Sequence, residues 1–244
     1  MRQLIFLGSI CLLAACGNNQ SGKPEAEKTE MAAPVSTAEA PAAPHPIAGN
    51  WVGFLGDNRL NVQIQTVQGK TVNGRSVAAG NFRVINGTLE ESPEAYTLQL
   101  KEPGDDKYDG EFTITIKKNG MVCEGNWQPY DKNLKAKPFT LAKKEFAYQP
   151  SAGIFPEASE RLLKEEDVAN YIKSELRLMR NSIYARHGYS FKMKDMRSQF
   201  DKEPWYMPVS TDVRNSLTEI EKKNEALIKR YEKYAAEFYD DFGR

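Results

Sequence analysis

The sequence predicts an α+β protein of two domains, an antiparallel β-barrel or β-sandwich followed by a small helical domain. Three observations support this prediction. Apolar residues alternate with polar ones over residues 47–148, and they recur at helical spacing over residues 151–244. Residues 1–46 instead have the composition of a targeting segment and a linker. A chain of 244 residues is long enough for two domains of ordinary size.

The first 15 residues have the features of a cleaved signal. A positive residue, Arg2, precedes an apolar run that extends from Leu4 to Ala15 and ends in two small alanines. This run has 12 residues, whereas a membrane-spanning helix needs about 20. We therefore expect residues 1–15 to be a signal peptide and exclude them from the fold.

The end of this signal, Leu13-Ala14-Ala15-Cys16, resembles the bacterial lipobox. The resemblance implies cleavage before Cys16 and attachment of acyl chains, palmitate among them, to its sulfur and its new amino group. Several chains together would hold a protein on a membrane that one chain binds only marginally. The membrane is thus a predicted partner. An Asp directly after Cys16 would resemble an inner-membrane retention signal, but this position is Gly17, which favours the outer membrane. Whether the protein faces the periplasm or the cell exterior stays open.

Residues 16–46 are predicted to be a disordered tether that begins at the lipidated cysteine. Residues 17–46 contain seven Ala and five Pro but no Phe, Trp or Tyr, so they cannot bury enough surface to offset chain entropy. Such a tether would span about 30 Å as a coil and roughly 90 Å when extended. Once the signal is removed and Cys16 is acylated, Cys123 is the remaining thiol, expected as a buried strand residue without a disulfide.

Residues 47–148 show the period of β-strands with one buried face. The inward positions are expected to include Leu60, Val62, Ile64, Tyr96, Leu98, Leu100, Phe112, Ile114 and Ile116. The dipeptides Asn73-Gly74, Asn86-Gly87 and Asn119-Gly120 tolerate the positive φ of hairpin turns, and Ser92-Pro93 and Pro103-Gly104 break the other runs. Seven to nine strands at this spacing fit a barrel or a sandwich.

Two further interpretations of this domain stay open. The opening Gly49-Asn50-Trp51 resembles the first-strand signature of lipocalin-like barrels, and a small barrel either holds one apolar ligand or is filled by its own side chains. The acidic loop 105–111 carries Lys107 at the third position, where a calcium loop needs an oxygen ligand. We therefore expect a solvated turn there, with no metal or other cofactor.

The charge balance excludes a basic nucleic-acid binder. The chain has 33 Lys+Arg against 33 Asp+Glu, with 13 against 12 over residues 47–150 and 17 against 17 over 151–244. No region therefore has the excess of positive charge that phosphate backbones require.

After Pro150 the hydrophobic period becomes helical. One predicted helix has Ser174 as its N-cap, Leu176, Met179, Ile183 and His187 on one face, and Gly188 at the left-handed position that ends it. A short amphipathic segment is expected around 167–172, another short helix around 193–200, and a long terminal helix over 217–238.

Within these helices the motif Tyr184-Ala185-Arg186-His187-Gly188 is followed by Tyr189, Trp205-Tyr206, Ile220-Glu221 and Asn224. This series closely resembles the YARHG domain over residues 161–231. Met179 and Ser182 depart from the usual Leu and Glu but keep the apolar pattern. The resemblance implies a domain of bacterial lipoproteins and secreted proteins, and it implies no activity.

The candidate binding or structural residues are those of this motif and its surroundings, Arg177, Arg180, Asn181, Tyr184, Arg186, His187, Tyr189, Trp205 and Tyr206. In the structural interpretation, His187 caps its helix by donating to the terminal carbonyls, within a cluster formed by Tyr184, Tyr189, Phe191, Trp205 and Tyr206. The arginines Arg177, Arg180 and Arg186 are then expected to pair with Glu175, Glu221 or Glu225.

Two functional alternatives compete with that interpretation. Arginines beside exposed Tyr and Trp rings suit a binding groove for carboxylate-bearing peptides or glycans. A hydrolase would need His187 as the base, and Ser182 and Ser190 are candidate nucleophiles only by their closeness in sequence. One histidine without further ligands is too little for zinc. The leading hypothesis is a lipid-anchored envelope protein that binds peptidoglycan, a glycan or an envelope protein without catalysis, the alternatives being the hydrolase and an apolar-ligand carrier.

Overall fold

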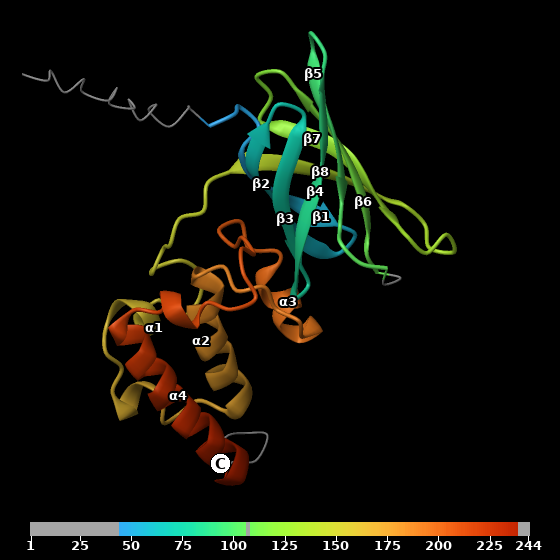
Figure 1. The fold of residues 1–244 in the computed structure, drawn as a ribbon. Helices are drawn as coiled ribbons and strands as arrows, with labels where there is room; N and C mark the ends of the chain where they lie inside the picture. The colour runs from blue at the N-terminus through green and yellow to red at the C-terminus, as the bar shows by residue number, and fades with distance from the viewer. Residues whose placement is uncertain (1–43, 106–107, 239–244) are drawn as a thin grey trace, which may run out of the picture. The chain divides into compact units, whose positions relative to one another are not determined.

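The computed structural model describes residues 44–105 and 108–238. Eight consecutive strands form a closed antiparallel barrel in which each strand pairs with the next and β1 pairs with β8 (Figure 1). The strands are β1 (Gly49–Leu55), β2 (Asn58–Gln68), β3 (Thr71–Ala78), β4 (Asn81–Glu91), β5 (Ala95–Lys101), β6 (Gly110–Lys117), β7 (Val122–Pro129) and β8 (Lys137–Lys144). The predicted antiparallel β domain is therefore confirmed, and it is a barrel.

The barrel interior is filled by the residues that the period of two places inside. Leu60, Val62, Ile64, Leu98 and Leu100 are at most 2% exposed, and the large side chains of the other strands are buried in the same core. Burying one such side chain contributes about 1.5 to 3 kcal/mol. Ile47 lies just before β1 in the same core, and its carbonyl accepts a hydrogen bond of 2.9 Å from Trp51 Nε1. Cys123 is buried on β7, as expected.

Two of the three predicted Asn-Gly turns are wrong. Asn119-Gly120 does join β6 to β7, but Asn73-Gly74 lies inside β3 and Asn86-Gly87 inside β4. A Cβ on Gly74 would stand 2.2 Å from the Gln63 carbonyl oxygen, and one on Gly87 would stand 1.8 Å from that of Gln99. These glycines therefore allow neighbouring strands to approach closely and do not serve to reverse the chain.

The helical region contains α1 (Glu157–Glu160), α2 (Lys173–Arg186), α3 (Lys194–Phe200) and α4 (Glu219–Phe238), with short 3-10 turns at Glu165–Asp167 and Arg214–Ser216. Helices α2 and α4 lie side by side (Figure 1) and share a core with Leu176, Met179, Ile183, Ile228 and Ala235. The predicted small helical domain is confirmed. No helix in residues 44–105 and 108–238 is long and apolar enough to span a membrane.

One detail of α2 differs from the prediction. Ser174 lies in the first helical turn, and Ile172 is the N-cap residue, whose backbone N–H donates to Glu175 Oε2 at 3.1 Å. The Glu175 carboxylate thus satisfies the backbone N–H of the N-cap residue itself, whereas a serine N-cap would have accepted an N–H of the first helical turn. The C-terminal end is as predicted, because Gly188 follows the helix with φ of 74°.

Hydrogen bonds join the outer face of the barrel to the chain that follows α2. Asn61 Nδ2 donates to the Pro208 carbonyl at 2.9 Å, and the Arg59 backbone N–H donates to Asp201 Oδ2 at 3.1 Å. The Gly80 N–H donates to Ser190 Oγ at 3.0 Å. Two residues of β2 and the β3–β4 connection therefore contact the chain that follows α2.

Candidate functional site

The first cluster of motif residues is organised around Glu221, which lies in the first turn of α4 and is fully buried. Its Oε1 accepts hydrogen bonds from Ser159 Oγ at 2.7 Å and from the Tyr148 hydroxyl at 3.0 Å. Its Oε2 accepts the Thr218 N–H at 2.9 Å and lies 2.6 Å from His187 Nε2. Burial would raise the pKa of Glu221, but the bonds from His187, Thr218 and Ser159 outweigh it and hold that pKa below its ordinary value.

Arg186, the central residue of the motif, is 2% exposed and is used as a backbone clamp. Its Nε donates to the Ala152 carbonyl at 2.9 Å, and its Nη2 donates to the carbonyls of Ile154 and Phe155 at 2.6 and 2.9 Å. Its Nη1 donates to Ser159 Oγ at 3.0 Å, which links the guanidinium to the Glu221 cluster. Burial lowers the pKa of Arg186, and the charge of Glu221 opposes this shift.

His187 is the C-cap residue of α2, and its side chain is 6% exposed. Its ring is stacked on Tyr148 with centroids 4.4 Å apart and an interplanar angle of 17°. The predicted donation to helix-terminal carbonyls is replaced by the bond to Glu221. A Cβ on the next residue, Gly188, would lie 2.5 Å from Val209 Cγ2, so glycine is required there both by φ and by space.

The predicted aromatic cluster exists, but it does not surround His187. Phe191, Phe200 and Tyr206 form a second core with Met196 and Ala185, against which Tyr184, Tyr189 and Trp205 pack. The Tyr206 hydroxyl donates to the Tyr189 carbonyl at 2.7 Å, and Trp205 Nε1 donates to Glu203 at 3.0 Å. Tyr206 is therefore a core residue and Trp205 packs against that core, which is the arrangement of the structural interpretation and not that of a binding groove.

The predicted arginine partners are also wrong. Arg177 pairs with Asp195, at the start of α3, and Arg180 pairs with Glu232, its Nε 2.9 Å from Oε2. Arg186 donates to carbonyls and to Ser159, while Glu225 accepts the Tyr184 hydroxyl. The chain places Glu232, not Glu221 or Glu225, opposite Arg180 across the contact between α2 and α4.

The two candidate nucleophiles of the hydrolase hypothesis are bonded to groups other than His187. Ser182 Oγ donates to the Leu178 carbonyl at 2.9 Å within its own helix, and Ser190 Oγ accepts the Gly80 N–H. In the described part of the chain neither serine bonds to His187, which is closed in between Tyr148 and Glu221. Geometry therefore gives no support to a dyad built on His187. Among residues 44–105 and 108–238 there is likewise no group of three or more His, Cys, Asp and Glu that could hold a metal ion.

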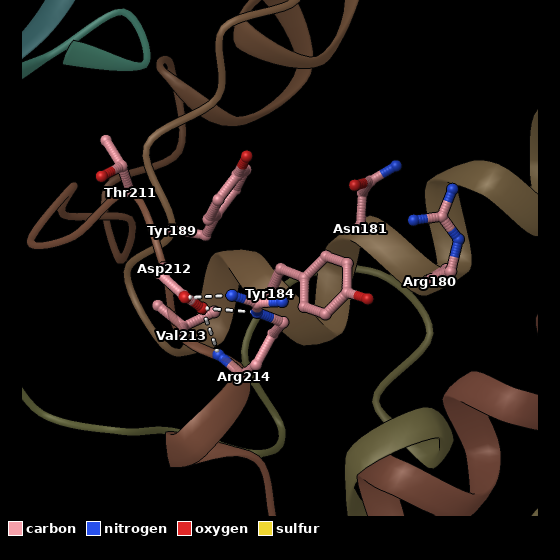
Figure 2. Close-up of a pocket in the computed structure, with 8 residues that line it drawn as sticks. All are labelled: Arg180, Asn181, Tyr184, Tyr189, Thr211, Asp212, Val213 and Arg214. Atoms are coloured by element: carbon pink, nitrogen blue, oxygen red, sulfur yellow. Dashed lines mark hydrogen bonds and ion pairs between the residues drawn. The ribbon is translucent and has the colours of Figure 1, made fainter.

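The remaining motif residues line a groove of about 370 Å³ on the helical region (Figure 2). One wall is the face of α2 that carries Arg180, Asn181 and Tyr184, and Tyr189 follows after the helix ends. The other wall is the segment Thr211, Asp212, Val213 and Arg214. The rings of Tyr184 and Tyr189 have centroids 6.0 Å apart, so the groove has an aromatic wall.

The two arginines of this groove differ in how tightly they are held. The Arg180 side chain is 19% exposed and is bonded twice to Glu232, at 2.9 and 3.2 Å. The Arg214 side chain is 81% exposed and, among the described residues, bonds to Asp212 alone, two residues away, at 2.6 and 2.9 Å. The bonds from the Arg214 side chain, and to a smaller extent the bond from its backbone N–H, lower the pKa of Asp212 to about 2. Arg214 is therefore the cation that an incoming anion can reach.

Sequence reasoning missed the wall formed by residues 211–214. The short Ser-Thr-Asp run after Pro208 shows an irregular segment, but nothing in it indicates which helix it will face. Of the nine candidate residues, the structure brings Arg180, Asn181, Tyr184 and Tyr189 together in the groove. Arg186 and His187 belong to the buried cluster, and Arg177, Trp205 and Tyr206 lie outside the groove. The candidate lipidation site, Cys16, lies outside the described residues.

The protein is thus a closed antiparallel barrel followed by a helical domain. In that domain Arg186 and His187 of the motif are linked to the buried Glu221, Arg186 through Ser159 and His187 directly. Residues 152–233 match the family model of the YARHG domain. The match confirms the resemblance drawn from the motif over residues 161–231. No curated protein and no solved structure matches the chain.

Proposed function

We propose that the protein is a lipid-anchored bacterial envelope protein whose YARHG domain binds a carboxylate-bearing ligand, a cell-wall peptide or glycan, without catalysis. The observation that carries this proposal is the groove in which Arg214 stands beside the rings of Tyr184 and Tyr189. A guanidinium binds carboxylates through two parallel bonds, and sugar or peptide faces stack on aromatic rings. A ligand carboxylate would replace Asp212 as the partner of Arg214.

The groove proposal predicts that Arg214→Gln weakens binding to isolated sacculi, and to the soluble muropeptides released from them, by about tenfold or more, because charge-assisted bonds contribute about 1.5 to 3 kcal/mol. Tyr189→Ala should weaken binding as well, through loss of the aromatic wall. Co-sedimentation with sacculi and calorimetric titration with muropeptides measure the effect in the full chain.

The matched control is Arg230→Gln. Arg230 is an exposed arginine on α4 that bonds to a single carboxylate, that of Glu165, at 2.7 Å, and it lies outside the groove. Its replacement should leave binding unchanged. Equal binding by wild type and Arg214→Gln, or an equal loss in both arginine variants, would contradict the groove as the binding site.

The anchor proposal rests on Cys16 in its lipobox-like context. Cells grown with labelled palmitate should incorporate the label into the wild-type protein, and Cys16→Ser should abolish incorporation, because it removes the sulfur in the lipobox-like context and the remaining thiol of Cys123 is buried in the barrel. The wild-type protein should fractionate with outer membranes and the variant should not. Label retained after Cys16→Ser would contradict lipid attachment at Cys16. It would not bear on the groove proposal, which the Arg214→Gln variant tests.

A further inference from the structure

A second cavity, of about 330 Å³, lies at the end of the barrel where the connections β1–β2, β3–β4, β5–β6 and β7–β8 are found. Its apolar wall includes Leu55, Leu60, Ala78, Phe112 and Trp127. Cavities that hold small ligands measure about 300 to 1,000 Å³ and combine apolar walls with a few polar groups. This one has the size for a small molecule.

The lining of this cavity includes a buried carboxylate, that of Glu102, which is 7% exposed. Its Oε1 accepts Ser76 Oγ at 2.9 Å, and its Oε2 accepts the Gly110 N–H at 3.0 Å and Trp127 Nε1 at 3.1 Å. All three donors are neutral. No Lys, Arg or His among the described residues forms an ion pair with Glu102, so its carboxylate is buried without a counter-charge from residues 44–105 and 108–238.

The other charged groups near the cavity do not supply the missing cation. Arg83 lines the cavity but is bonded to Asp109, its Nε 2.7 Å from Oδ1, so these two charges cancel. Lys137 also contributes to the lining, and its Nζ lies 5.7 Å from the centre of the Trp127 ring. Burial, opposed by the bonds from Ser76, Trp127 and Gly110, raises the pKa of Glu102, as expected for a carboxylate that lacks a cationic partner.

We infer that the open end of the barrel binds a small amphipathic monoamine, whose ammonium pairs with Glu102 and whose apolar body lies against Trp127 and Phe112. A buried carboxylate without a counter-ion attracts a cation, and the aromatic wall adds contact area and a favourable surface for positive charge. The positive charge of Lys137, which also lines the cavity, disfavours a second ammonium on the ligand. This site lies in the barrel and is separate from the groove of the helical domain.

The test is calorimetric titration of the full chain with tyramine, with hydroxyphenylpropionate as a probe of similar shape and opposite charge, and with para-cresol as a neutral probe. Tyramine is expected to bind at least about tenfold more tightly than either, and Glu102→Gln is expected to weaken it by about tenfold or more, the size of one charge-assisted interaction. The control Glu124→Gln removes an exposed carboxylate of β7 outside the cavity and should change nothing.

A second variant separates loss of the site from loss of the fold. Glu102→Gln disturbs bonds to Ser76 and Trp127, whereas Ala78→Leu fills the cavity and leaves those bonds in place. Ala78→Leu should abolish tyramine binding while the near-ultraviolet circular dichroism of the protein is retained. Absence of tyramine binding to wild type, equal binding of the carboxylate probe, or unchanged binding in Glu102→Gln or in Ala78→Leu would each overturn the inference.

Discussion

Replacing Glu221 by alanine is expected to lower the free energy of unfolding by about 3 to 5 kcal/mol, the cost of removing one member of a buried charged network. The change leaves the hydroxyls of Ser159 and Tyr148 and the N–H of Thr218 without their acceptor. It also removes the negative charge that faces the buried guanidinium of Arg186. Denaturant unfolding followed by circular dichroism measures the difference.

The matched control for this variant is Glu219→Ala in the same turn of α4. Glu219 is 79% exposed, and its one ion pair within the part of the chain that the structure describes is with Lys222, three residues along the helix. Its replacement should change the free energy of unfolding by less than about 0.5 kcal/mol. Similar losses in the two variants would mean that the buried network contributes no more than a surface ion pair.

The effect of Glu221→Ala should also depend on pH. The pKa of Glu221 is lower in the folded protein than its ordinary value, so the folded state favours the ionised carboxylate. The contribution of this group is therefore present above its ordinary pKa and is lost as pH falls through the folded-state pKa. The difference between wild type and variant should therefore stay constant from pH 7 down to about 4.5 and narrow as the pH falls further, whereas a difference that stays constant at lower pH would show that the charge is not involved.

The second large effect is expected from Gly87→Ala on β4. The added Cβ would stand 1.8 Å from the Gln99 carbonyl oxygen and 2.9 Å from Leu100 Cα, both backbone atoms of β5. Relief requires separation of two paired strands in a closed barrel, so the expected cost exceeds about 3 kcal/mol. Thermal or denaturant unfolding, with reaction of the buried Cys123 thiol as a readout of the barrel, checks the result.

The comparison variant is Gly69→Ala in the turn between β2 and β3. Gly69 has φ of 58°, and a Cβ added there would meet nothing within 4 Å, so only backbone conformation opposes the change. That cost is about 1 to 2 kcal/mol. If Gly87→Ala proves no more costly than Gly69→Ala, close approach of β4 and β5 is not the reason for the glycine.

These two glycines show where sequence reasoning on the barrel succeeds and where it stops. Alternation identified the inward residues of β2, β5 and β6, because burial of one strand face leaves a period of two. The same Asn-Gly sequence forms a turn at Asn119-Gly120 and allows close approach of a neighbouring strand at Asn86-Gly87. The difference depends on the paired strand, which lies outside the local sequence.

The candidate site was predictable as a set of residues but not in its arrangement. The motif located Arg180, Tyr184, Arg186 and His187 correctly on one helix and at its end. Which of them face the core and which face the groove depends on the rotation of α2 against α4. That rotation also decides that Arg180 meets Glu232 while Glu225 meets the Tyr184 hydroxyl.

The contact of Tyr148 with His187 and Glu221 bears on how this domain can be moved between proteins. Tyr148 lies after β8 and before residues 152–233, the part of the chain that matches the family model. The barrel's trailing segment thus supplies both a stacked ring and a hydrogen-bond donor to the motif of its neighbour. A graft onto another host protein that started at residue 152 would leave that histidine uncovered, so a transplantable module should begin upstream of Tyr148.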